Sequence, residues 1–477
     1  MTSSFYWYDL ETSGTDPKWD RMVQVAGLRT DEDLNVIGDE LCTYVRLGED
    51  VLPNPEACLV TGIMPETLQR EGIPEVQAWE EITRRFTVPE TCVVGYNSLR
   101  FDDEFVRYGL YRHLFDPYAR EWQNGCSRWD ILDLVRAAGG LRRDGIHWPQ
   151  NEDGLPVYKL EELTKANGIG HSNAHDALAD VHATIAMARL IKQQQPKLFD
   201  YYFALRNKRA VREVLEPYGS QLLVHVSGIY PRERFGVAPV VSLTRHPTNT
   251  NSVIVVDLAQ DITSLLEQSE HEIRNQLFTS GQRDRPPLKE IKINRCPFIA
   301  PIDVLDDENI QRLQLNMRDI KERARRLKQP GLMQKIRRVY TQPKQQPADD
   351  ADAALYQGFL QDEDRSRCLH FHASRRQGDW PEMDFSDPRL MPLVQRMKAR
   401  SHPDLLDSKE QGQWEEFVAR KLHGEGDWLN LQQFHARLDE LSATLEAAGE
   451  TLKLGHMQQL REYGRALSER YPESSGA

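Results

Sequence analysis

Four carboxylates and one histidine in this 477-residue chain have types and spacings that suit phosphodiester hydrolysis. Asp9 and Glu11 are separated by one residue, Asp102 follows much later, and His175 precedes Asp180. Two Mg²⁺ or Mn²⁺ ions about 3.5–4 Å apart require such a set, because hard cations prefer oxygen ligands and a substrate phosphate supplies the rest. His175 is placed to take the proton from an attacking water, a role typically worth ~10²–10⁴ in rate.

Each of these residues stands where the pattern predicts the end of a strand or the start of a helix. Aromatic residues 6–8 predict a buried strand, and alternation along that strand sends Asp9 and Glu11 to one side. A second buried strand at 92–96 leads to Asp102 at a helix start, where Asn97 can cap. A longer helix that opens near residue 173 carries Asp180.

Each signal alone also has an ordinary structural explanation. Asp9 and Glu11 by themselves are more simply two solvated acids at a strand end. Either Asp102 or Asp103 can be a first-turn acid stabilised by the helix dipole, and a single His175 is more simply a surface histidine. The order and the contexts of all five residues together favour the metal site.

The elements around these residues predict an α/β layer structure. Strands at 23–28 and 42–47 follow the first strand, a turn-rich connection spans 53–65, and apolar residues at helical spacing predict a helix at 74–87. Arginines then interleave with aromatic residues, which suits either bases stacking on rings or arginines packing over an aromatic core. These residues are Arg107, Arg112, Tyr118, Trp122, Arg128, Trp129 and Arg136.

The pattern changes after residue 196. A helical stretch at 199–215 precedes predicted strands at 221–226, 237–243 and 252–258, which indicate a small β-rich second domain. Residues 309–344 hold 11 basic and 2 acidic residues, a local balance of 11 − 2 = +9 that favours an acidic partner. Residues 342–352 lack large apolar side chains and predict a linker, and the remainder is helical in pattern.

Composition restricts the compartment and the class of protein. The net charge of −13 argues against a surface coated for nucleic acid throughout, so the local basic segment matters more than the sum. The six cysteines include no C-x-x-C pair, which predicts neither a zinc site nor a disulfide framework. With no signal-peptide pattern and no apolar run near 18 residues, we expect a cytoplasmic protein without a membrane anchor.

At this point the sequence resembles the DEDD 3′-to-5′ exonucleases, in the branch with a catalytic histidine. The resemblance is carried by Asp9, Glu11, Asp102, His175 and Asp180, and it is closer still to the bacterial exonuclease I family. The stretches similar to that family include G-Y-N-S-L-R-F-D-D-E at 95–104, S-R-W-D at 127–130, L-T-K-A-N-G-I at 163–169, S-N-A-H-D-A at 172–177 and I-N-R-C-P at 293–297.

The resemblance implies three parts: an RNase H-like mixed-sheet exonuclease domain at 1–195, an SH3-like β domain at 196–347 and a C-terminal helical domain at 348–477. It implies two Mg²⁺ ions, with Mn²⁺ as a substitute, and processive 3′-to-5′ release of 5′ mononucleotides from single-stranded DNA in repair and recombination. The strand contacts it implies are Arg107, Tyr118, Trp122, Arg136, Lys159, Lys208, Asn251 and Asn294.

The resemblance also implies a protein partner, the acidic C-terminal tail of the single-stranded-DNA-binding protein. The residues that correspond to its docking site are Arg142, Tyr201, Arg318 and Lys328, and the enzyme is expected to be a monomer. Two alternatives stay open at this stage. One is the same chemistry on RNA, although such relatives need only the first domain, and the other is a non-catalytic scaffold that binds DNA.

Overall fold

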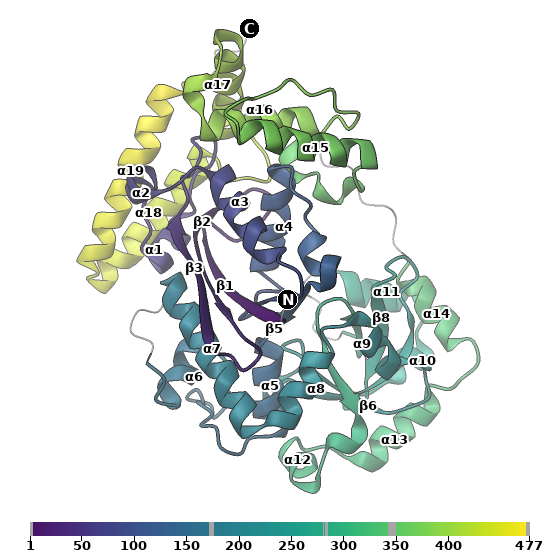
Figure 1. Ribbon diagram of the computed structural model, residues 1–477. Helices are drawn as coiled ribbons and strands as arrows, with labels where there is room; N and C mark the ends of the chain where they lie inside the picture. Colours follow the sequence, from purple (N-terminus) through teal and green to yellow (C-terminus); the bar gives the residue numbers. More distant parts are fainter. Residues whose placement is uncertain (1–2, 171–175, 280, 282–284, 342–349, 474–477) are drawn as a thin grey trace.

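The structure, a computed structural model, describes residues 3–170, 176–279, 281, 285–341 and 350–473 (Figure 1). Its first sheet has five strands in the order β3-β2-β1-β4-β5, with β1 in the centre. β1 pairs antiparallel with β2 and parallel with β4, so the sheet is mixed, as predicted. The strands are β1 (Ser4–Thr12), β2 (Met22–Thr30), β3 (Val36–Tyr44), β4 (Thr91–Gly95) and β5 (Ser127–Asp130).

Helices cover both faces of this sheet. Phe5 and Trp7 pack with residues of α5 (Leu132–Leu141) and α7 (Ala177–Gln194). Tyr6 and Tyr8 pack on the other face, against α3 (Glu75–Phe86) and α4 (Asp102–Arg112), and α6 (Leu160–Ala166) lies against α7. Because side chains alternate along a strand, Asp9 and Glu11 lie on the same side as Trp7, toward α7.

A second sheet of five antiparallel strands follows, in the order β10-β6-β7-β8-β9. Its core is continuous with that of α5 and α7, and α5 contacts β6 and β10. The strands are β6 (Leu223–Val226), β7 (Val237–Arg245), β8 (Ser252–Asp257), β9 (Leu288–Lys292) and β10 (Phe298–Pro301). The helices of this part are α8 (Pro196–Ala204), α9 (Lys208–Leu215), α10 (Thr263–Glu267), α11 (Glu270–Phe278), α12 (Asp307–Arg312), α13 (Met317–Arg326) and α14 (Leu332–Val339).

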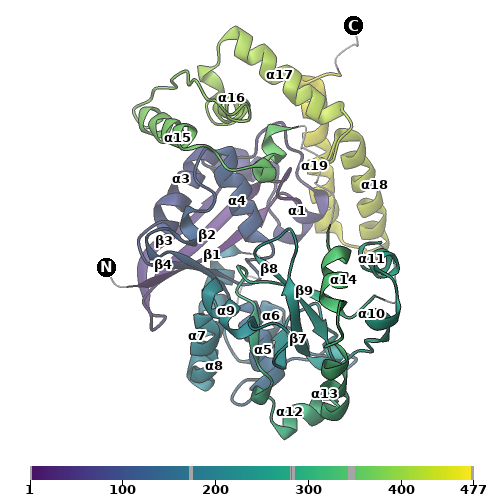
Figure 2. The same cartoon turned by 90° about the vertical axis from the view of Figure 1, so that its right-hand side faces the viewer.

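The C-terminal part is helical, and Figure 2 shows its helices α15, α16 and α17 above the first domain and the second sheet below it. Its helix α16 contacts α3, while α18 and α19 contact α1 (Pro55–Thr61). The helices are α15 (Asp362–Arg375), α16 (Leu390–Ser401), α17 (Ser408–His423), α18 (Leu431–Ala448) and α19 (Thr451–Arg470). Among the described residues, no helix is long and apolar enough to cross a membrane.

Several predicted elements differ from those observed. The third strand spans Val36–Tyr44 rather than 42–47, because irregular pairing around Gly38 lets a largely exposed segment join the sheet edge. The turn-rich connection at 53–65 contains α1 (Pro55–Thr61) and leads to α2 (Pro65–Glu71). Each of these helices begins with proline, which is compatible with a first helical position.

Two further predictions of chain path need correction. The helical stretch at 199–215 is two helices, α8 and α9, rather than one. The predicted linker at 342–352 ends in a fixed position, because Asp352 is 1% exposed and contacts arginines of both the first and the C-terminal domain. Residues 342–349 of that linker lie outside the described residues.

Candidate active site

Three of the predicted carboxylates form one cluster. Oxygen atoms of Asp9, Glu11 and Asp180 all lie within 4.8 Å of one another, close enough to bind a single metal ion. Asp102 belongs to the same site electrostatically, since its charge acts directly on both Asp9 and Glu11. The structure therefore brings together the four acids that the sequence singled out.

Asp102 is held in place by a turn whose key residue the sequence analysis did not identify. Asp130, at the end of β5, accepts hydrogen bonds from the backbone N–H groups of Asn97 (2.9 Å) and Leu99 (3.1 Å). The turn is tight, because a Cβ at Gly95 would lie 2.6 Å from the Ser98 side chain. The backbone of Asn97 is left-handed (φ 62°), and this residue does not cap α4 as predicted.

Asp180 is positioned by the start of α7. Asp176 caps this helix, and its carboxylate accepts hydrogen bonds from the backbone N–H groups of Leu178 (3.0 Å) and Ala179 (3.4 Å). Asp180 therefore lies in the first turn of a helix that packs on β1, facing the end of that strand. The predicted base, His175, lies outside the described residues.

The surroundings of the acids raise their pKa values. Burial, followed by the charge of Asp102, raises the pKa of Asp9 well above its usual range. Burial and the charges of Asp180 and Asp102 raise the pKa of Glu11 to about 8. Burial also raises the pKa of Asp102 to about 8, although backbone hydrogen bonds oppose the shift.

The donor set fits divalent cations. Among the described residues, no lysine or arginine forms an ion pair with Asp9, Glu11 or Asp102. Hard oxygen donors that repel one another in a partly buried site are stabilised by a bound cation. Asp9, Glu11, Asp102 and Asp180 are thus the residues that would hold such ions.

Asp103, the neighbour of Asp102, has a different role. Its carboxylate is fully buried and forms ion pairs with Arg120 and Arg128. Burial opposes ionisation, but the two guanidinium groups outweigh it and hold the pKa of Asp103 below its usual value. Of the two candidate acids at this helix start, Asp103 therefore forms structural ion pairs, and Asp102 is the one that can bind a metal ion.

The predicted strand contacts on the first domain differ in exposure. Arg107 is buried, with Nε 2.9 Å from Glu121 and Nη1 3.0 Å from Glu104, and its guanidinium lies 5.6 Å from the Tyr118 ring. Trp122 is 67% exposed. Arg136 is half-buried and pairs with Asp133 at 2.8 Å. Of the other interleaved residues, Arg112, Arg128 and Trp129 are buried, as the packing interpretation expects.

The remaining predicted strand contacts come from several elements. Lys159 is exposed just before α6, and Lys208 is exposed at the start of α9. Asn251 and Asn294 lie next to each other in the second domain, since the N–H of Ile293 donates to the carbonyl oxygen of Asn251 at 2.9 Å. The carbonyl oxygen of Asn294 accepts a hydrogen bond from Arg128 at 3.1 Å, so this loop lies against the first domain.

The C-terminal part contributes aromatic residues that the sequence analysis missed. The hydroxyl of Tyr356 donates to Glu104 at 2.5 Å, and Arg295 of the second domain also binds Glu104, at 2.6 Å. Phe359 is 73% exposed and its ring lies 5.7 Å from that of Tyr118. Glu104, two residues from Asp102, therefore joins all three parts. The available signal in the sequence was the pair of aromatic residues, Tyr356 and Phe359, just after the predicted linker.

Arg142 and Tyr201, two of the predicted partner contacts, line one pocket. The pocket has a volume of about 480 Å³, lies between α5, α8 and β10, and also includes Lys197 and Phe298. Arg142 donates to the carbonyl oxygen of Val304 at 2.9 Å, which fixes its place at the rim. Arg318 and Lys328 are exposed at the two ends of α13 and do not line this pocket.

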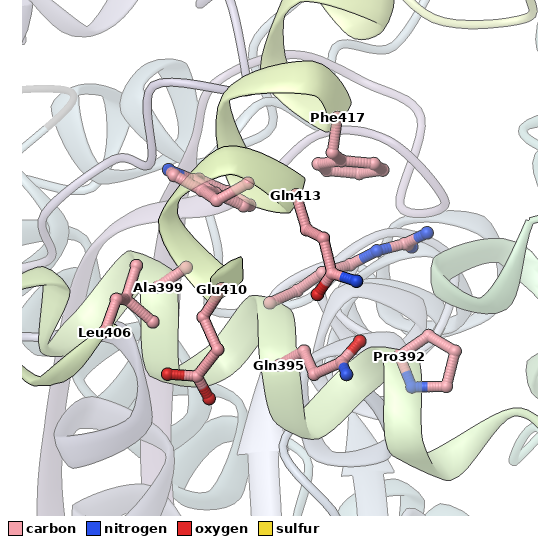
Figure 3. A pocket seen from close by; sticks show the side chains of 9 residues that line it. Pro392, Gln395, Ala399, Leu406, Glu410, Gln413 and Phe417 are labelled. Carbon is pink, nitrogen blue, oxygen red and sulfur yellow. The ribbon is translucent and has the colours of Figure 1, made fainter. Parts of the chain in front are cut away.

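A third location can be set aside as a catalytic centre. A pocket of about 140 Å³ lies between α16 and α17, where Gln395 and Gln413 extend into the space between the helices (Figure 3). Its acid, Glu410, is paired with Lys398 at 2.7 Å. Without a group of unpaired acids, this pocket lacks the donors that the carboxylate cluster provides.

Comparisons with known proteins cover all three parts of the chain. Family models match at residues 6–188 (Exonuclease), 206–342 (Exonuclease I SH3-like domain) and 349–467 (Exonuclease I C-terminal domain). The exodeoxyribonuclease I of Escherichia coli is 42% identical over 459 residues, which are 93% of this chain and 96% of that protein.

Solved structures agree with these matches. E. coli exonuclease I in complex with a dA16 oligonucleotide has a TM-score of 0.92 at 39% identity, over 98% of this chain and 100% of that one. A complex of SSB and exonuclease I with the inhibitor CFAM has a TM-score of 0.89 at 39% identity, with the same coverage. The predicted order of an exonuclease domain, an SH3-like domain and a C-terminal helical domain is confirmed.

Proposed function

Because this chain belongs to the exonuclease I family and is a 3′-to-5′ exodeoxyribonuclease, we propose that it hydrolyses single-stranded DNA by a two-metal mechanism. The observation that carries the mechanism is the cluster of Asp9, Glu11 and Asp180, with Asp102 beside it and no described cation paired to Asp9, Glu11 or Asp102. Among the divalent cations, we propose Mg²⁺ as the natural ion, with Mn²⁺ as a substitute.

The roles of the residues follow from their positions. Bound ions would supply Lewis acidity, lowering the pKa of the attacking water and stabilising the leaving 3′ oxygen. Asp9 and Glu11 hold their carboxylates together because they share one face of β1, and Asp102 and Asp180 approach from two helix starts. We assign the proton transfer from water to His175, and His175→Ala should lower the rate by ~10²–10⁴ with little change in strand affinity.

We propose that the strand is enclosed between the three parts, which would make digestion processive. This proposal is supported by the distribution of the candidate strand contacts, which lie on elements of all three parts. Exposed rings of Trp122 and Phe359 suit base stacking, and Lys159 and Lys208 suit phosphates. Arg107, Tyr118, Arg136, Asn251 and Asn294 complete the proposed contacts, and Tyr356 joins them because it binds Glu104 beside Asp102. The bounds 1–195, 196–347 and 348–477 remain our proposal for the domains.

The experiment that tests the function uses one gel. Purified protein with Mg²⁺ is incubated with 5′-labelled single-stranded DNA, single-stranded RNA and duplex DNA of matched sequence. We expect only the single-stranded DNA to be digested, from its 3′ end. Because digestion is expected to be processive, the full-length band should give way to short 5′-labelled products without bands of intermediate length. Equal or faster loss of RNA would favour the alternative of an RNA 3′-exonuclease, and binding without cleavage would favour a DNA-binding scaffold.

We also propose that the pocket at Arg142 and Tyr201 binds the acidic C-terminal tail of the single-stranded-DNA-binding protein. A basic rim over an apolar floor suits a peptide that combines carboxylates with a terminal ring. Arg142→Ala should weaken binding of an acidic peptide ending in Phe, while digestion of naked DNA stays unchanged. In the same proposal Arg318 and Lys328 add long-range attraction, the enzyme is a monomer, and it works in the cytoplasm in DNA repair and recombination.

A further inference from the structure

The loop that follows the proposed metal ligand Glu11 is short and is closed by hydrogen bonds between its two ends. The pairing of β1 with β2 is irregular directly after Glu11, and such bulges often re-aim side chains next to active sites. The N–H of Ser13 donates to the carbonyl oxygen of Arg21 at 2.8 Å, and the N–H of Arg21 donates to the Ser13 hydroxyl at 3.0 Å. A displacement of this loop, residues 13–21, is therefore transmitted to the end of β1.

The helix that carries Asp102 holds the same loop. Arg112, at the end of α4, donates to the carbonyl oxygens of Lys18 (2.8 Å) and Pro17 (3.1 Å). Arg112 is buried, so these bonds are shielded from water. Two elements that supply metal ligands, β1 and α4, thus meet at residues 13–21.

The C-terminal domain contacts this loop through an ion pair. Arg21 lies 3.0 Å from Asp352, which also lies 2.8 Å from Arg400. Arg400 in turn pairs with Asp50 of the first domain at 2.7 Å. The side chains of these four residues are all nearly inaccessible to solvent, so the pairs are little screened by salt.

A second contact is aromatic. The ring centroids of Trp19, in the loop, and Trp428, between α17 and α18, lie 5.2 Å apart, with the edge of one ring toward the other at an interplanar angle of 65°. The ammonium group of Lys421 lies 4.1 Å from the Trp19 ring and 3.8 Å from the Trp428 ring. Trp428 is itself fixed, because its indole N–H donates to the carbonyl oxygen of Lys421 at 2.8 Å. The C-terminal domain thus holds Trp19 from two sides.

We propose that the C-terminal domain positions the catalytic metal ligands through residues 13–21, with Trp19 and Arg21 as the positioning residues. This inference rests on the proposed metal-dependent hydrolysis. It adds that residues outside the carboxylate cluster determine how well the metal ligands are positioned. Neither Trp19 nor Arg21 belongs to the carboxylate cluster, so they act through the geometry of β1 and α4. A domain proposed to enclose the strand then also sets how well the site holds its ions.

The test cuts the aromatic contact from the C-terminal side in the full chain. Trp428→Ala removes the ring that holds Trp19, and Trp380→Ala is the matched control, because Trp380 packs on Phe371 and His402 within its own domain. The Mg²⁺ affinity is measured in two ways: from the rise in thermal stability of the DNA-free protein with Mg²⁺ concentration, and from single-turnover cleavage of a 5′-labelled oligonucleotide of three nucleotides. This short substrate keeps the readout independent of strand enclosure.

We expect Trp428→Ala to raise the Mg²⁺ concentration for half-maximal rate about 10-fold, in the range seen for residues that orient metal ligands. The KM for the oligonucleotide should stay unchanged, and the control should match wild type. Trp428→Phe, which keeps a ring at this position, should restore much of the wild-type Mg²⁺ dependence. If Trp428→Ala does not fold, Lys421→Met, which keeps the side-chain length, is expected to show the same shift. An unchanged Mg²⁺ dependence in the folded variant would overturn the proposal, whereas a wild-type enzyme indifferent to Mg²⁺ would instead refute the proposed function.

Discussion

Two groups of buried acids in this molecule have opposite surroundings. At the site, burial and mutual repulsion raise the pKa values of Asp9, Glu11 and Asp102. At the contact with the C-terminal domain, burial acts in the same direction on Asp352, but the charges of Arg400 and Arg396 outweigh it and hold its pKa well below the usual range. The charge of the second group is neutralised by arginines of the chain itself, whereas the charge of the first group requires a bound cation.

The largest expected effect is the loss of cleavage when an acid of the first group is substituted. Asp180→Asn should reduce Mg²⁺-dependent cleavage at least ~10³-fold, because a metal ligand contributes several kcal/mol to the transition state. Strand binding should be nearly unchanged, since no phosphate-contacting cation is lost. Single-turnover rates and strand affinity measure both, and a rate within tenfold of wild type would contradict the metal assignment.

The control for that variant is Asp176→Asn. Asparagine caps a helix about as well as aspartate, so α7 should keep its start. The substitution removes one nearby acid without removing a proposed ligand, and we expect a rate within about tenfold of wild type.

The next effect concerns stability at the C-terminal contact. Asp352→Ala should destabilise the full chain by about 3–5 kcal/mol, because Arg21 and Arg400 would remain buried without this partner. Thermal unfolding of the variant measures the loss. Asp404→Ala, at an exposed acid of the same domain, should stay within about 0.5 kcal/mol of wild type, and equal losses in both variants would show that burial of the pair is unimportant.

At the site the same kind of substitution should have the opposite sign. In EDTA, Asp9→Asn should stabilise the protein by about 1–3 kcal/mol, because it removes a carboxyl group that folding forces either to take up a proton or to stay charged beside other acids. Wild type, but not this variant, should gain about 2–3 kcal/mol when Mg²⁺ is added at a hundred times its dissociation constant. A metal-free Asp9→Asn protein less stable than wild type would remove the distinction between the two groups.

The smallest effect is a pH dependence without metal. The folded-state pKa of Glu11 is about 8, above its unfolded value, so the folded state binds more protons between those pH values. Stability in EDTA should therefore rise as pH falls from 8 to 6.5, with Glu11 contributing about 1–2 kcal/mol. Glu11→Gln should lose this contribution, whereas that of Asp102, whose pKa is also raised to about 8, should remain. The pKa of Asp352 lies below its unfolded value, so its contribution is lost only in stronger acid.

The sequence predicted the site better than the contact because of distance along the chain. Asp9 and Glu11 follow from alternation in one strand, and Asp102 and Asp180 from helix starts, which are local signals. The choice between Asp102 and Asp103 needed the structure, since Arg120 and Arg128, which pair with Asp103, lie on two other elements. Arg21 and Asp352 are 352 − 21 = 331 positions apart, and the acidic run at 350–352 has the composition of a linker.

The wide separation of Arg21 from Asp352 also has a consequence for biosynthesis. A ribosome that has completed Asp180 must add 352 − 180 = 172 residues before Asp352 exists, which takes roughly 9–34 s at typical rates. During that interval the nascent chain has its four acids but lacks the residues that hold Trp19 and Arg21. If those residues position the ligands, the emerging polypeptide has low nuclease activity until its last third is synthesised and folds.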